Sequence, residues 1–137
     1  MSKFFFAFFS VAILVGAPSA MSGCASTSAK GSAPVISNLS ISAQTIVVGQ
    51  TETLIGQFDF ADPEGDLKDL GLTLSLNGQS TTVPRAALQG VGGQTTGKAN
   101  YTILVAAPQA GTVELKLVAY DAAGNASNEL KQNVVAR

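Results

Sequence analysis

Acidic residues gather in one short segment of this sequence. Of the nine aspartate and glutamate residues in the chain, five lie within residues 59–69: Asp59, Asp62, Glu64, Asp66 and Asp69. A second turn, farther along the chain, carries Asp121 and Asn125. Calcium takes about six to eight oxygen ligands from such side chains, and it would reduce the repulsion among like charges. The candidate calcium ligands are therefore Asp62, Glu64, Asp66, Asp121 and Asn125.

The same residues also fit a turn that binds nothing. Pro63 and Gly65 are enough to form a tight turn, and aspartate favours turns without any metal. The helix–loop–helix calcium motif needs a bidentate carboxylate at its last position, where this segment, counted from Asp62, has Thr73. Exposed acids next to Lys68 are typical of a solvated loop. A calcium site and a solvated turn both remain open at this point.

The composition excludes several kinds of catalytic site. The chain has no histidine and one cysteine, which rules out Ser-His and Cys-His nucleophiles, histidine zinc sites and an internal disulfide. Two carboxylates can hydrolyse a glycosidic bond, but that chemistry needs a cleft that raises the pKa of one of them. Loops of one small domain offer little shelter, so we predict that the protein is not an enzyme. The charge balance of 8 basic to 9 acidic residues, with no basic cluster, argues against nucleic-acid binding.

The N-terminus has the pattern of an export signal that ends at the single cysteine. Lys3 precedes an apolar run of about fourteen residues, which is too short for a membrane span of about 20 residues and typical of a signal-peptide core. Met21-Ser22-Gly23-Cys24 follows and resembles the lipobox of bacterial lipoproteins. The resemblance implies cleavage before Cys24 and attachment of diacylglycerol and an acyl group such as palmitate to that residue. The alternative is ordinary signal cleavage after Ala20, which Pro18 disfavours.

These features predict three segments. Residues 1–23 form the signal peptide, residues 24–33 the lipidated cysteine with a flexible tether, and residues 34–137 the folded domain. The tether is rich in small and polar residues, and nine residues of it reach at most about 30 Å. In enterobacteria-like lipoproteins, aspartate after the cysteine retains the protein in the inner membrane. Ala25 stands there, so the resemblance implies the outer membrane, with the domain facing the periplasm or the cell surface.

From residue 34 onward, apolar residues alternate with polar ones. A period of two places each apolar set on one face of a β-strand. The sets are Leu54, Gly56, Phe58 and Phe60; Leu70, Leu72, Leu74 and Leu76; Tyr101, Ile103 and Val105; and Val113, Leu115, Leu117 and Ala119. Turn signals separate them at residues 48–52, 62–66, 77–80, 90–98, 107–112 and 121–125. With further strands near 35–42, 82–88 and 128–135, about seven strands predict an all-β, antiparallel, Ig-like β-sandwich, with an up-and-down barrel as the alternative.

The segments FDFADPEGDLKDLGLTL and PQAGTVELKLVAYDAAGNASNEL resemble the Ig-like, PKD-like and cadherin-like modules of bacterial surface proteins. The resemblance covers residues 34–137 and implies generic roles in adhesion, spacing, or contact with carbohydrate or protein. In this topology the two acidic turns lie at one end of the sandwich, so their oxygen atoms converge. The chain enters at the same end, which places Arg137 far from the lipid.

We therefore expect a lipid-anchored cell-envelope protein that presents a non-catalytic Ig-like binding or structural module. Two alternatives remain. One is a hydrolytic, carbohydrate-processing lipoprotein that uses the loop carboxylates. The other is a calcium-stabilised adhesion module or a subunit of an envelope complex, which the outward Ile55, Leu104, Val118 and Tyr120 could serve. The expected partners are membrane lipid through Cys24 and an envelope protein or glycan, and no nucleic acid.

Overall fold

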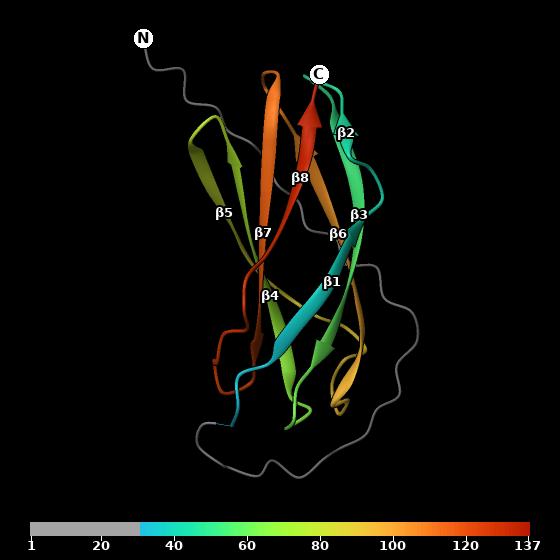
Figure 1. Ribbon diagram of the computed structural model, residues 1–137, viewed down its shortest axis with the longest axis vertical. Helices are drawn as coiled ribbons and strands as arrows, with labels where there is room; N and C mark the ends of the chain where they lie inside the picture. Colours follow the sequence, from blue (N-terminus) through green and yellow to red (C-terminus); the bar gives the residue numbers. More distant parts are fainter. Residues whose placement is uncertain (1–30) are drawn as a thin grey trace.

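The chain forms eight β-strands in the computed structural model, which describes residues 31–137 (Figure 1). The strands are β1 (Val35–Ile41), β2 (Thr45–Ile46), β3 (Thr51–Ala61), β4 (Leu67–Leu76), β5 (Gln79–Ala87), β6 (Thr96–Ala106), β7 (Gly111–Asp121) and β8 (Leu130–Ala136). No helix occurs among these residues. The predicted signal peptide, Cys24 and most of the predicted tether lie outside the described residues.

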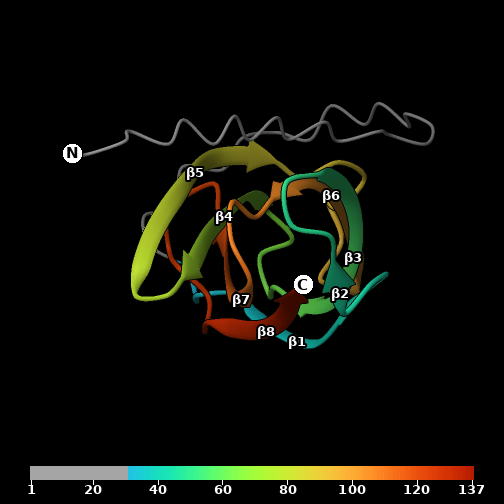
Figure 2. The same ribbon diagram turned by 90° about the horizontal axis from the view of Figure 1, so that it is seen from above.

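The strands form two sheets that face each other. One sheet has the order β1-β3-β6 and the other the order β2-β8-β7-β4-β5. Neighbouring strands are antiparallel except for β2 and β8, which pair in parallel. Seen from above, β3 and β6 lie on one side of the molecule and β4 and β7 on the other (Figure 2). The predicted Ig-like β-sandwich is confirmed, and the two separate sheets differ from the alternative of a closed barrel.

The alternating apolar residues meet in the space between the sheets. On β3 the predicted inward set is buried from Leu54 to Phe60, and on β7 Leu115, Leu117 and Ala119 are fully buried. A strand whose every second side chain is apolar contributes one such row to the core, and each row adds hydrophobic free energy in proportion to the area buried. The core therefore follows directly from the alternation in the sequence.

Two strand boundaries differ from the sequence-based expectation. β5 begins at Gln79 because Asn77 and Gly78 have positive φ angles of 50° and 80°, which form a two-residue hairpin turn. β2, a two-residue strand at Thr45–Ile46, is an eighth strand that the alternation does not reveal. Two residues are too few for a periodic pattern, and their pairing with β8 depends on residues 90 positions away, Val135 and Ala136.

One close contact fixes the spacing of β3 and β6. Gly56 on β3 pairs with Tyr101 on β6, and a Cβ atom at position 56 would overlap the tyrosine ring. Tyr101 is 2% exposed, and its ring centroid lies 6.3 Å from that of Phe58. Its hydroxyl has no hydrogen-bond partner among residues 31–137, and burial raises the pKa of Tyr101 above its ordinary value. Gly56 thus makes room for a ring that fills the core.

Replacing Gly56 by alanine should destabilise the protein by about 1–3 kcal/mol, the usual cost of overfilling a packed core. The measurement is the free energy of unfolding from urea denaturation. The matched control is Gly92→Ala, because a Cβ at Gly92 would meet no neighbouring atom. Equal stability of the two variants would contradict the contact.

The buried tyrosine should also make stability depend on alkaline pH. The unfolded chain releases the Tyr101 proton near pH 10, whereas the folded protein retains it, so the free energy of unfolding should fall above about pH 10 and be unaffected below. At about pH 11 the loss should be about 1 kcal/mol. Tyr101→Phe should remove this loss and cost little at pH 8, while Tyr120→Phe, at a half-buried site, should retain it. The same alkaline loss in Tyr101→Phe would refute the assignment.

Candidate functional site

The acidic turn connects the two sheets at the lower end of the molecule in Figure 1. Asp62 begins it, and three hydrogen bonds hold this residue. Its N–H donates to the carbonyl of Thr95 at 2.7 Å, its carbonyl accepts from the N–H of Gly65 at 3.0 Å, and its Oδ2 accepts from the N–H of Asp66 at 2.9 Å. Gly65 adopts a positive φ of 66°, which glycine accepts without strain. The turn is therefore fixed by its own backbone and by the Asp62 side chain.

Loops from two other parts of the chain close over this turn. The loop between β5 and β6 crosses from one sheet to the other and contacts it through the N–H of Gly93, which donates to Gly65 at 2.7 Å. The loop between β7 and β8 contacts it through the N–H of Ala122, which donates to the carbonyl of Asp66 at 2.9 Å. The predicted convergence of the two acidic turns at one end is therefore present in the structure.

This enclosure corrects the expectation of a solvated loop for two of the acids. Asp62 is 0% exposed and Asp121 is 3% exposed, whereas Glu64 is exposed and Asp66 half-buried. The sequence around Asp62 is polar, and the burial comes from residues 93–95 and 122, which are distant in sequence. Burial raises the pKa of the Asp62 carboxyl, and the nearby charge of Asp66 raises it further against the opposing hydrogen bonds.

Three of the five candidate calcium ligands lie together. One carboxylate oxygen from each of Asp62, Glu64 and Asp66 lies within 4.8 Å of the other two. The Oδ1 atoms of Asp62 and Asp66 are both buried and accept no hydrogen bond from any residue in the range 31–137. Two buried carboxylate oxygens of the turn thus lack a hydrogen-bond donor in the described part of the protein.

The other two candidates, Asp121 and Asn125, are engaged with each other. Asp121 Oδ1 accepts from the Asn125 N–H and Oδ2 accepts from Asn125 Nδ2, both at 2.8 Å. Nδ2 of Asn125 also donates to the carbonyl of Gly31 at 3.1 Å. These bonds build the turn after β7 and attach the start of the described chain to it. Because both oxygens of Asp121 already accept hydrogen bonds from Asn125, these two residues stabilise the loop.

Asn128, later in this loop, connects the two sheets, a role that the sequence analysis missed. The side-chain amide of Asn128 donates to the carbonyl of Ile36 and accepts from its N–H, each at 2.8 Å. It therefore binds β1 as a neighbouring strand would. Ser127 Oγ accepts from the N–H of Ala119 at 2.9 Å. The sequence signal was the run of asparagine and serine after Gly124, whose side chains replace backbone partners in such loops.

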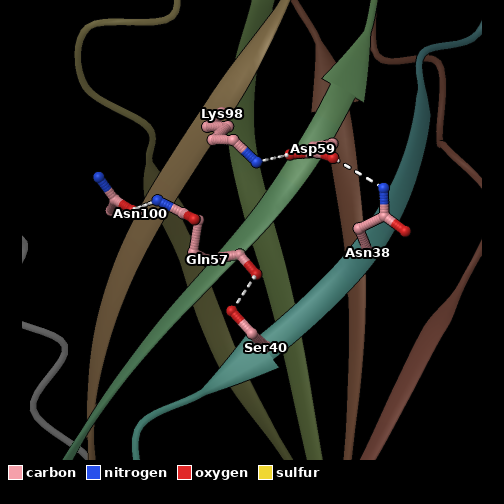
Figure 3. A network of polar contacts seen from close by, with 6 residues as sticks. All are labelled: Asn38, Ser40, Gln57, Asp59, Lys98 and Asn100. Carbon is pink, nitrogen blue, oxygen red and sulfur yellow. Dashed lines mark hydrogen bonds and ion pairs between the residues drawn. The ribbon is translucent and has the colours of Figure 1, made fainter.

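Asp59 lies outside the acidic cluster, on the outer face of the three-stranded sheet. Its carboxylate accepts from Lys98 Nζ and from Asn38 Nδ2, both at 2.7 Å (Figure 3). The hydrogen bond from Lys98 lowers the pKa of Asp59, with a smaller effect from Asn38. On the same face, Gln57 Nε2 donates to Asn100 Oδ1 at 2.8 Å. These partners give the outer face of the sheet a polar row across three strands.

Several solved structures are similar to this chain, at low sequence identity. No protein-family model and no curated protein matches it. Among solved structures, the PKD domain of a peptidase from a Thermoplasmatales archaeon is 16% identical with a TM-score of 0.45, over 76% of this chain and 92% of that one. A conjugative transposon lipoprotein from Bacteroides eggerthii is 18% identical with a TM-score of 0.45, over 74% and 95%. The SrpA adhesin from Streptococcus sanguinis is 15% identical with a TM-score of 0.45, over 78% and 60%.

No helix within residues 31–137 is long and apolar enough to cross a membrane.

Replacing Asn128 by alanine should destabilise the protein by about 2 kcal/mol, because the N–H and the carbonyl of the buried Ile36 both lose a part-buried hydrogen bond. Urea denaturation measures the change. Asn133→Ala is the matched control, since Asn133 lies exposed on β8. If both variants unfold at the same urea concentration, Asn128 does not hold β1.

Proposed function

We propose that this protein is a lipid-anchored cell-envelope protein that displays a non-catalytic Ig-like module. The observation that carries the proposal is the Met21-Ser22-Gly23-Cys24 motif at the end of an apolar segment of signal-peptide length. Cys24 becomes the first residue of the mature chain and carries the lipid. Two or three acyl chains on one residue give stable attachment, since each buried CH₂ contributes about 0.8 kcal/mol. The expected location is the outer membrane, because Ala25 and not aspartate follows the cysteine.

The roles of the acidic side chains favour a binding or structural module over a hydrolase. Asp62 and Asp121 are buried, which a catalytic pair also requires, yet each accepts hydrogen bonds from the backbone of its own turn. These bonds hold the loops in place. A glycosidase pair instead flanks a substrate cleft with both carboxyl groups free to reach the scissile bond.

The position at which the chain enters the domain determines which end of the domain faces away from the membrane. Gly31 and Ser32 contact the acidic end through Asn125 and Glu64. From Cys24 to this point, about seven residues reach at most ~25 Å, so the acidic end stays near the membrane. At the opposite end, the N–H of Gly49 donates to Ala107 and that of Val48 to Arg137. This distal end, with the Asn77–Gly78 turn, faces away from the lipid and is the part that an envelope protein or glycan reaches first.

The outward apolar residues do not favour the envelope-subunit alternative. Ile55 and Leu104 lie on the three-stranded sheet, whereas Val118 and Tyr120 lie on β7 in the other sheet. Ile55 is 56% exposed, and the Tyr120 ring is covered by the guanidinium of Arg85, 3.5 Å from its centroid. They therefore lie on opposite faces of the sandwich and do not form a single patch.

Replacing Cys24 by serine should release the protein from the membrane, because serine cannot form the thioether to diacylglycerol. Cells that express the wild-type chain or the variant are separated into membrane and aqueous fractions. The wild type is expected in the membrane fraction, with acyl groups on its N-terminal peptide by mass spectrometry. The Ser26→Ala variant, which changes a residue beyond the motif, should behave as the wild type. A Cys24→Ser chain that stays fully in the membrane after losing its signal peptide would refute the lipid anchor.

A further inference from the structure

We propose that the turn between β3 and β4 binds a calcium ion through Asp62, Glu64 and Asp66. This inference does not rest on lipid attachment at Cys24. It also narrows the set of ligands that the sequence suggested, because Asp121 and Asn125 satisfy each other.

The spacing of the three carboxylates fits a shared ion. One oxygen from each residue lies within 4.8 Å of the others. Two oxygens bound to the same calcium ion at about 2.3–2.6 Å are separated by at most about 5 Å. A single ion can therefore contact all three oxygens without a change in the path of the turn.

An independent observation points to the cation. The Asp62 side chain is 0% exposed, and its Oδ1 has no hydrogen-bond donor among residues 31–137. The buried Oδ1 of Asp66 lacks a donor in the same range. A buried carboxylate oxygen that neither a donor nor a cation compensates is unfavourable. The ion pairs within the described residues involve Asp59, Glu114 and Glu129, and none of them includes a carboxylate of the turn.

The ligand chemistry selects calcium. All three side chains offer oxygen, and the chain has no histidine, so the site is unlike the nitrogen and sulfur sites of zinc. Magnesium usually retains several waters and binds one or two carboxylates, whereas calcium accepts several carboxylates from an irregular loop. Asp62 Oδ2 and Glu64 Oε1 already accept hydrogen bonds from Asp66 and Ser32, which orients both carboxyl groups before the ion arrives.

Thermal unfolding of the full chain, purified in detergent, tests the site. We expect 2 mM calcium chloride to raise Tm by about 5 °C or more relative to excess EDTA, because an ion that binds only the folded state stabilises it. Titration calorimetry with calcium should show one ion per chain. Magnesium at the same concentration should produce a smaller shift, and an equal shift would overturn the calcium assignment.

The decisive variant is Asp62→Asn. It should lose most of the calcium-dependent rise in Tm, and in EDTA it should be at least as stable as the wild type, because an amide places no charge in the buried position. Asp59→Asn is the matched control and should keep the full calcium shift, since Asp59 faces Lys98 on the outer sheet face. Should Asp62→Asn fail to fold, Glu64→Gln, at the exposed ligand, must still reduce the shift. No calcium shift in the wild type, or an equal shift in every variant, overturns the proposal.

Discussion

The arrangement of this protein depends on how the chain crosses between its two sheets at Asp62. The residue directly follows β3, and the turn that it begins must deliver β4 to the opposite sheet. Burying a carboxylate is unfavourable, yet Asp62 holds the turn from both sides: its Oδ2 accepts from the N–H of Asp66, and its backbone N–H donates to the carbonyl of Thr95 in the next crossing. The loops after β5 and β7 then close on the same turn. One end of the sandwich is thus organised around the buried carboxyl group of Asp62.

The calcium proposal and the lipid proposal concern the same end of the domain for different reasons. Ser32 donates to Glu64, so the first described residues of the chain lie on the acidic turn. An ion bound there would hold the point where the domain leaves its tether. The opposite end, where β2, β8 and the hairpin at Asn77–Gly78 lie, is then free for recognition. On these two proposals, one end of the sandwich serves attachment and the other end serves contact.

Much of the fold could be predicted because a period of two is a local signal. Leu54 to Phe60 and Val113 to Ala119 reveal their inward faces without any knowledge of their neighbours. β2 could not be predicted, since two residues carry no period, and the role of Asn128 could not, since its partner Ile36 is 92 residues away. The candidate site was predicted in part. The sequence identifies Asp62, Glu64 and Asp66, but the burial of Asp62 depends on loops that the local sequence does not contain.

The attachment of β1 has a mechanical consequence. The chain enters at the acidic end, and β1 runs from there towards the distal end with β3 antiparallel beside it. Their hydrogen bonds lie perpendicular to the strands. In the proposed arrangement, a pull between the tether and a partner at the distal end is therefore directed along β1, and it loads the bonds from Val35 to Ile41 in shear. The two bonds of Asn128 to Ile36 reinforce the entry of that strand. With the proposed anchor and a distal partner, this geometry resists tension along the length of the domain better than unzipping from its first strand.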